Sequence, residues 1–478
     1  MRWWGWACAL AAVGCRNVAP PGTVFYASGA ELQSINPLLT VHPLARQIQR
    51  YALFMTLARY DTALVARPYL AERWSWSADR RTLDVTVRAD VRWHDGVPVT
   101  AADVAFTLDA ARDSATGYPR RADLECLARV RASDARAVRL EFCRPQPGLP
   151  DVLTDLAILP AHLLAALPHA GLRGAAFNQH PVGDGPFRFV SHVPDQRWVF
   201  EANRDFPAAL GGPPGLARLV VVIVDEPATK LAGLVTGELD VAGILPMHAA
   251  LVRRDPALAV ESYPLLLTYL LAWNNRRPPL DDPRLRHALT LALDRRAIVD
   301  AYLYGFGVVA DGPVPPWHPL AVPVERVPYD RAASAALLDS LGWRAGAQGV
   351  RERAGRPLAF TLLTVGAADN ALEQMIQADL RAVGVGVRIR QLELGAFLAR
   401  AGGAARDYDA LVTGVLGDLS LGYLRGLFDS RRRDEPLQYA QYADPAVDRA
   451  LDAGDVAEVQ RLVARDLPVT FLYHAMGL

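Results

Sequence analysis

The sequence predicts an α/β protein with at least two lobes, and three observations support this class. The chain has 478 residues, more than one hydrophobic core usually holds, so we expect more than one lobe. Apolar residues make up 51% of the chain, which indicates a folded rather than a disordered protein. Residues 358–390 read as strand, helix and strand, the order that is typical of a parallel sheet.

Composition excludes several classes of function. The 51 basic residues balance 51 acidic ones, so no global field attracts nucleic acid or an anionic membrane. The ten histidines are scattered without metal-ligand spacing, and the chain contains no GxSxG, HExxH or Walker A string. We therefore predict no catalytic residues, no metal site, no cofactor and no nucleic-acid partner.

The N-terminus predicts an exported protein. Arg2 precedes an apolar run, Trp3–Val13, which is shorter than the roughly 20 residues needed to span a bilayer. Small residues then lead to Cys15, and this string resembles the lipobox of bacterial lipoproteins. Residues 1–15 are thus predicted to be a signal peptide with lipidation at Cys15, and residues 16–22 a tether; an ordinary signal peptide with an incidental cysteine is the alternative.

The first mature strand covers Thr23–Ala27, where residue types alternate. A loop containing Gly and an Asn-Pro pair follows it. Ligand sites of α/β folds gather at such strand ends. The loop therefore becomes a candidate ligand contact, with a plain turn as the alternative.

Residues 83–111 predict a strand, a turn and a capped helix. Residues 83–88 alternate like a strand, and Asp95 with Gly96 marks a turn. Thr100 lies at the N-cap of the next helix, with Asp103 three residues later as in a capping box. The buried face of this helix is predicted to consist of Val104, Leu108 and Ala111.

A disulfide is predicted between Cys126 and Cys143. Residues 130–132 and 137–142 read as two strands around a turn. A turn centred between Asp134 and Ala135 places the two cysteines opposite each other, where Cα atoms of an antiparallel pair lie about 4.5 Å apart. Two free cysteines are the alternative, which export disfavours.

The middle of the chain predicts two further strand and helix units. Gly183-Asp184-Gly185 lacks the helix N-terminus that a phosphate loop needs, so we interpret it as a turn into a strand. Residues 219–224 form an apolar strand before a helix at 227–235. A strand ending at Trp273 leads to Asp282 and Pro283, which suit the N-cap and first position of a helix.

Several of these strings resemble one protein family. WHDGVPVTAADVAF (93–106), PVGDGPF (181–187) and YLLAWNNRRPPLDDPRLRHA (269–288) are similar to segments of the extracytoplasmic solute-binding proteins of peptide ABC importers, solute-binding family 5. The resemblance implies an α/β, bilobal fold of the periplasmic-binding-protein type II-like class with an extra subdomain in the first lobe.

The same resemblance implies a division of the chain. Lobe I would comprise residues 23–43 and 186–268, with the extra subdomain at 44–185. Lobe II would cover residues 269–436, and residues 437–478 would return to lobe I.

The resemblance also implies candidate ligand contacts in two regions. The loop after the first strand is similar to a cleft-lining "ESLNPLL"-type segment, which implies Ser28, Glu31 and Leu32. In the family a tryptophan near position 317 reaches the ligand, which implies Trp317, although such a ring also suits the core.

The last candidates are Gly414 and Asp418. They lie where the family has a "GW..D.PDP" pattern with a carboxylate for the ligand amine. Here Val415 replaces the tryptophan, and the second aspartate and its proline are missing. Asp418 is the available carboxylate, with a solvated loop residue as the alternative.

The function that the resemblance implies is a lipid-anchored substrate-binding protein of an ABC importer. It would be a monomer on the outer face of a bacterial membrane or in the periplasm. It would capture a small peptide in the inter-lobe cleft, close on it and deliver it to the permease subunits. A receptor for a nickel chelate, a sugar or another non-peptide solute is one alternative, and an exported hydrolase is another.

Overall fold

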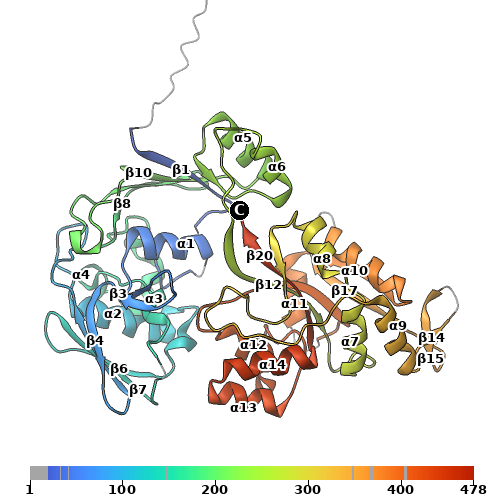
Figure 1. Cartoon of the computed structure of the whole chain (residues 1–478). Coiled ribbons are helices and arrows are strands. Elements are labelled where there is room, and N and C mark those ends of the chain that lie inside the picture. The colour runs from blue at the N-terminus through green and yellow to red at the C-terminus, as the bar shows by residue number, and fades with distance from the viewer. Residues whose placement is uncertain are drawn as a thin grey trace, which may run out of the picture. The chain divides into compact units, whose positions relative to one another are not determined.

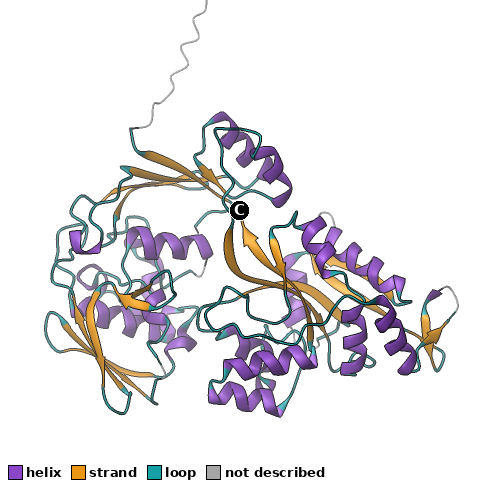
Figure 2. Ribbon diagram, viewed as in Figure 1, coloured by secondary structure: helices purple, strands orange, loops and turns teal. Residues whose placement is uncertain are grey.

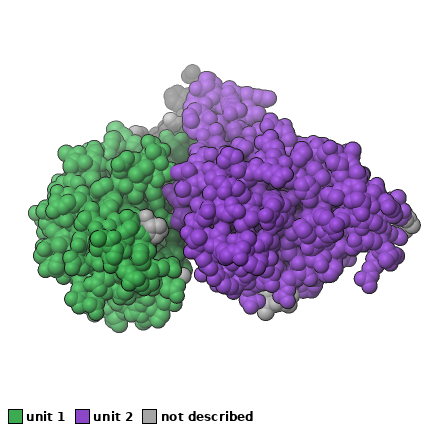
Figure 3. All heavy atoms as spheres, turned by 60° about the horizontal axis from the view of Figure 1, so that its bottom comes forward, with its two compact units in different colours: residues 1–243 green, residues 244–478 purple. Residues whose placement is uncertain are grey.

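The computed structural model describes residues 20–478, apart from residues 33, 41, 147, 347–348, 367–369 and 403–405. The chain divides into two compact units, residues 1–243 and residues 244–478, coloured green and purple in Figure 3. The predicted signal peptide and the lipidation site at Cys15 lie outside the described residues. Within the described part, none of the helices combines the length and the apolar character needed to span a bilayer.

The first unit is built from two main sheets and short helices (Figures 1 and 2). Its strands are β1 (Thr23–Ser28), β2 (Ala58–Tyr60), β3 (Ala66–Pro68), β4 (Ala71–Trp76), β5 (Thr82–Val87), β6 (Leu127–Ala132), β7 (Ala137–Phe142), β8 (Phe187–Val193), β9 (Arg197–Ala202), β10 (Arg218–Ile223) and β11 (Val241–Ala242). Its helices are α1 (Pro43–Ile48), α2 (Ala101–Arg112), α3 (Val152–Asp155), α4 (Ala161–Leu164) and α5 (Pro227–Thr236).

The two sheets of this unit have different topologies. One has the order β11-β1-β10-β9-β8, with β1 parallel to both of its neighbours. The other, β4-β5-β7-β6, is antiparallel throughout and falls within residues 44–185, the range predicted for an extra subdomain. Strands β2 and β3 form a separate pair.

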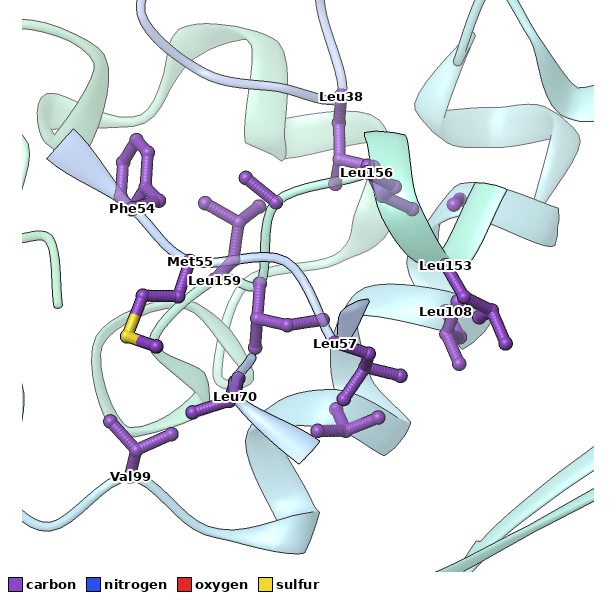
Figure 4. Packing of buried hydrophobic residues seen from close by; sticks show 14 of the residues in the cluster. Leu38, Phe54, Met55, Leu57, Leu70, Val99, Leu108, Leu153, Leu156 and Leu159 are labelled. Atoms are coloured by element: carbon purple, nitrogen blue, oxygen red, sulfur yellow. The ribbon is translucent and has the colours of Figure 1, made fainter. Parts of the chain in front are cut away.

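One hydrophobic core runs through the first unit. Figure 4 shows part of it, including Leu108 of α2, Leu153 of α3 and the residues Phe54 and Met55, which belong to the same buried cluster. The predicted capping box is present, because the Thr100 N–H donates to Asp103 Oδ2 at 2.7 Å. Val104, Leu108 and Ala111 are at most 1% exposed, which confirms the predicted buried face of α2.

The β6–β7 hairpin carries the disulfide. Cys126 and Cys143 are bonded, with their Cα atoms 5.0 Å apart, and the Cys143 N–H donates to the Cys126 carbonyl at 2.8 Å. The predicted disulfide is present, but the strands pair one residue out of the predicted register, with Val130 opposite Leu140. An irregularity between Leu127 and Arg129 restores the predicted pairing at Leu127 and Phe142, next to the cysteines.

The Gly183-Asp184-Gly185 turn leads into β8 and is locked onto a distant backbone segment. A Cβ at Gly183 would lie 1.9 Å from the Leu53 carbonyl oxygen, so only glycine fits there. Asp184 Oδ1 accepts a hydrogen bond from the Met55 N–H at 2.8 Å. The turn thus holds residues 53–55 in place.

The second unit contains one large sheet with helices on it (Figure 1). Its strands are β12 (Tyr263–Trp273), β13 (Gly307–Val309), β14 (Arg344–Ala345), β15 (Arg351–Arg353), β16 (Arg356–Pro357), β17 (Ala359–Val365), β18 (Gly386–Leu392), β19 (Ala410–Leu416) and β20 (Val469–Gly477). Its helices are α6 (Ala249–Val252), α7 (Pro283–Leu291), α8 (Arg295–Ala297), α9 (Arg331–Ser340), α10 (Ala371–Ala382), α11 (Leu394–Gly402), α12 (Tyr423–Phe428), α13 (Pro445–Ala453) and α14 (Val456–Asp466).

The large sheet has the order β13-β20-β12-β19-β17-β18. Strand β17 is parallel to β18 and to β19, as predicted for residues 358–390, whereas β12 is antiparallel to both β19 and β20. Strands β14, β15 and β16 form a small separate sheet.

Helix α7 begins at the position that the sequence predicts. Asp282 caps it by accepting a hydrogen bond from the Arg284 N–H at 2.9 Å.

The end of the chain lies in the second unit, which differs from the predicted return to lobe I over residues 437–478. Strand β20 pairs with β12 and β13 and is almost wholly buried. The second unit also begins at residue 244, before the predicted boundary at 269, which falls inside β12 (Tyr263–Trp273). An apolar strand buried on both faces fits either sheet equally well, so its pattern does not show which sheet it joins.

Candidate ligand-binding site

The predicted ligand residues fall into two groups, one in each unit. Ser28, Glu31 and Leu32 follow β1 in the first unit, and Trp317, Gly414 and Asp418 lie around β12 in the second.

Ser28 and Leu32 are both buried within the first unit. Ser28 ends β1 and its hydroxyl donates to the Ala30 carbonyl at 2.5 Å. Leu32 is fully buried in the core of the first unit. Both side chains therefore shape the loop, and neither is exposed in this unit.

Glu31 organises a polar cluster. Its carboxylate accepts hydrogen bonds from Trp198 Nε1 (2.5 Å), from the Asp195 N–H (3.0 Å) and from the Leu32 N–H (2.8 Å). His192 Nε2 lies 3.3 Å from Glu31 Oε2, the oxygen that also accepts from the Asp195 N–H, and its ring stacks on Trp198 at 3.6 Å. Burial acts to raise the pKa of Glu31, but these hydrogen bonds outweigh it and the net pKa is lowered.

A cavity of about 430 Å³ opens beside this cluster. Its lining includes Glu31, Ser34, Arg173, Gln179, His192 and Trp198. Because the Glu31 carboxylate already accepts several hydrogen bonds, its contribution here is to position the Trp198 and His192 rings. The sequence analysis predicted Glu31 as a candidate but not these two rings, which follow it by more than 150 residues.

In the second unit, Trp317 lies against the start of β12. Its Nε1 donates to the Leu265 carbonyl at 3.2 Å, and its ring meets that of His474 edge-on at 6.0 Å. The side chain is half-buried. The proline-rich loop around it thus holds the ring in one orientation.

Gly414 lies on β19 opposite Tyr269 of β12. A Cβ at position 414 would lie 3.1 Å from the Cε2 and Cζ atoms of Tyr269, closer than most Cβ contacts. The absence of a side chain at Gly414 therefore leaves room for the tyrosine ring.

Asp418 stabilises the loop after β19. Its Oδ1 accepts from the Ser420 hydroxyl at 2.6 Å and from the Gly422 N–H at 3.1 Å. Within the described residues, Oδ2 accepts no hydrogen bond, and the side chain is partly exposed. One carboxylate oxygen thus holds the loop, while the other stays available.

His474 was not identified from the sequence and lies beside Trp317. Its Nδ1 lies 2.9 Å from the Thr268 hydroxyl, and burial lowers the pKa of His474 to about 4, so the ring is neutral near pH 7. It lines a cavity of about 310 Å³ whose other walls are mostly valines and prolines of residues 308–324. In the local sequence, the one feature that could have pointed to His474 is its position near the end of an apolar strand.

Metal-binding side chains are not grouped in the described parts of the two units. No cluster of three or more His, Cys, Asp or Glu residues suited to hold a metal ion occurs among them. The polar groups described above are hydrogen-bond donors and acceptors flanked by aromatic rings.

Comparison with known proteins identifies the family. Residues 66–427 match the family described as bacterial extracellular solute-binding proteins, family 5 middle. The chain belongs to this family. The resemblance seen in the sequence is therefore confirmed. Family 5 consists of extracytoplasmic binding proteins that serve transport.

Individual family 5 relatives match over most of the chain. Protein XP55 of Streptomyces lividans is 31% identical over 88% of this chain and 78% of its own length. The oligopeptide-binding protein AppA of Bacillus subtilis is 26% identical over 95% of this chain and 86% of its own length.

Solved structures show the same fold. AppA in complex with a nonapeptide has a TM-score of 0.76 at 25% identity, covering 95% of this chain and 93% of that one. NikZ of Campylobacter jejuni in complex with Ni(L-His) has a TM-score of 0.79 at 24% identity, with 96% and 93% covered. The predicted fold class, the bilobal periplasmic-binding-protein type II fold, is confirmed.

Proposed function

We propose that this protein is the extracytoplasmic substrate-binding protein of an ABC importer and that it captures a small peptide or peptide-like solute. The family 5 match over residues 66–427 carries this proposal. The likeness to AppA, a protein named for oligopeptide binding and solved with a nonapeptide, supports the peptide part.

The two groups of candidate residues fit such a ligand. The cavity beside Glu31 is polar and bordered by aromatic rings, and the region around Trp317 and His474 joins an aromatic pair to a mostly apolar cavity. A peptide offers both polar backbone groups and apolar side chains, which match these surroundings. The predicted inter-lobe position of the ligand remains part of the proposal.

We further propose that the protein is exported as a monomer, anchored by a lipid on Cys15, and that it delivers the ligand to the membrane permease subunits. The lipobox-like string before Cys15 supports the anchor, and the extracytoplasmic character of family 5 supports export. The protein binds its solute without chemical turnover.

Native mass spectrometry of the exported protein tests this function. We expect a co-purified peptide that is released intact after unfolding. A nickel chelate or a sugar as the bound species would overturn the peptide assignment but keep the binding role. Progressive cleavage of added peptides by purified protein would instead support the hydrolase alternative and contradict the proposal.

A further inference from the structure

A buried carboxylate in the second unit lacks a cationic partner. Glu373, in the first turn of α10, is 8% exposed. Its Oε1 accepts from the Thr364 hydroxyl at 2.6 Å. Among the described residues, no other group donates to Glu373 and no Lys or Arg forms an ion pair with it. Because one hydroxyl donor uses only part of the hydrogen-bonding capacity of a carboxylate, Glu373 can accept further donors.

Three tyrosines surround this carboxylate. Tyr269 of β12 and Tyr473 of β20 are paired across the sheet and stack at 4.8 Å. Tyr302, which follows α8, lies 6.5 Å from the Tyr473 ring and is 38% exposed. Within the described part of the chain, none of the three hydroxyls has a hydrogen-bond partner, although Tyr473 is only 1% exposed.

Helix α10, which carries Glu373, packs against the π-helical turn Ile298–Tyr302. Leu372 of the same helix lies in one core with Tyr473, and Tyr269 packs against that core. Burial, followed by the negative charge of Glu373, raises the pKa of Tyr269. Burial and the other tyrosines, together with Glu373, also raise the pKa of Tyr302 and of Tyr473. The elements that carry Glu373 and the three tyrosines therefore pack together on the face of the sheet that α10 covers.

This location adjoins a candidate ligand residue. Tyr269 lies next to Gly414 on β19, whose missing side chain leaves room for the ring. The exposed fraction of Tyr302 gives the cluster contact with solvent. A solute bound near Gly414 thus has access to the aromatic rings.

We propose that Glu373, Tyr269, Tyr302 and Tyr473 form a subsite for an organic cation, an ammonium or guanidinium group of the bound solute. The carboxylate supplies the opposite charge and a charge-assisted hydrogen bond. The tyrosine rings supply cation–π attraction, and their unpartnered hydroxyls accept further donors. Anions are excluded because Glu373 repels them. This inference rests on the proposed function and names the charge of the solute.

Calorimetric titration with matched peptides tests the subsite. The probes are trialanine with a free N-terminus, N-acetyl-trialanine, N-acetyl-Ala-Lys-Ala and the non-peptide cation agmatine. We expect Glu373→Gln to weaken binding of the cationic probes about 10- to 100-fold and to leave N-acetyl-trialanine unchanged. If Glu373→Gln weakens binding of trialanine but not of N-acetyl-Ala-Lys-Ala, the α-amine of the peptide occupies the subsite. If it weakens only the lysine peptide, a side-chain amine occupies it.

Matched variants separate the subsite from general effects. Tyr302→Leu should weaken cation binding about 2- to 5-fold, whereas Tyr304→Leu, two residues away and 56% exposed, should not. Glu261→Gln, on an exposed residue, is the matched charge control. Thermal midpoints equal to that of the wild type confirm that each variant is folded.

Each outcome decides between the two proposals. The subsite is overturned and the peptide function stands if the wild type binds peptides and Glu373→Gln leaves their affinity unchanged. The same conclusion follows if Asp418→Asn, and not Glu373→Gln, removes the preference for cations. If the wild type binds agmatine but no peptide, and Glu373→Gln abolishes this, the subsite stands and the peptide function falls. Binding of no probe at all overturns both.

Discussion

Arginine side chains in this protein act largely as internal connectors. Lys230 is the sole lysine of the sequence, and several arginines are buried. Arg286, for example, is 3% exposed and donates to the carbonyls of Leu280 and Leu467. The planar guanidinium presents several donors in fixed directions, which lets one side chain bind carbonyls from distant segments.

Asp155 shows the same use of arginine around a buried carboxylate. It is 9% exposed and forms ion pairs with Arg46, Arg50 and Arg120. Burial acts to raise the pKa of Asp155, but the three positive charges outweigh it and lower the pKa. This residue thus ties α1 and the turn after it to α3.

We predict that Asp155→Asn lowers the free energy of unfolding by about 3–5 kcal/mol, because it removes the carboxylate that pairs with Arg46 and Arg50 and leaves Arg120 with Asp123 alone. Urea unfolding measures this change. The control is Asp84→Asn, which breaks a pair with Arg139 in which both side chains are about half exposed (50% and 55%) and should cost no more than about 1 kcal/mol. Equal effects of the two variants would contradict this account.

Asp184 predicts a pH dependence of stability. It is 1% exposed, its Oδ2 lacks a described partner, and burial raises its pKa well above the usual value. The folded state therefore holds a proton that the unfolded state releases, so stability falls as pH rises above the unfolded pKa, until the folded pKa is passed.

The comparison of wild type with Asp184→Asn isolates this effect. We expect the wild type to lose stability relative to the variant by up to about 1.4 kcal/mol for each pH unit above about 4. Urea midpoints at pH 4, 5.5 and 7 measure the difference. Parallel pH profiles for the two proteins would show that Asp184 does not titrate as proposed.

At the scale of elements, local sequence signals predicted several helices and the β6–β7 hairpin. The capping box before α2, the N-cap of α7 and the β6–β7 hairpin depend on residues within a few positions of each other. Their geometry therefore follows from the local sequence alone. The pairing of β20 with β12 does not, because about 200 residues separate the two strands.

The β6–β7 disulfide is predicted to stabilise the first unit. Cys126 and Cys143 are 17 positions apart in the sequence, so the double change Cys126→Ala with Cys143→Ala should lower the free energy of unfolding by about 3 kcal/mol. Urea unfolding with and without a reductant measures this. Reductant should destabilise the wild type and leave the double variant unchanged; a wild type insensitive to reductant would contradict the prediction.

At the scale of the whole molecule, two units of similar size form separate cores. A binding protein with two lobes responds to its ligand when one arrangement of the lobes binds it better, since the ligand then shifts the equilibrium toward that arrangement. The hinge motion predicted from the sequence is of this kind.

We predict that saturating ligand, once identified by mass spectrometry, reduces the radius of gyration of the protein in solution. Small-angle X-ray scattering with and without ligand measures the change. A solute that does not bind is the control and should leave the profile unchanged. Identical profiles with and without the true ligand would rule out closure.

The sequence by itself determined the family, the two-lobed α/β class, the main helix boundaries and the disulfide, because these depend on local patterns and on strings of neighbouring residues. Only the tertiary structure decided that β20 joins the second sheet, that Glu31 is held by Trp198 from 167 residues away, and that Glu373 lies among three tyrosines. Such contacts join distant segments, and no local pattern encodes which distant residue completes them. The charge of the proposed subsite therefore emerges only from the folded chain.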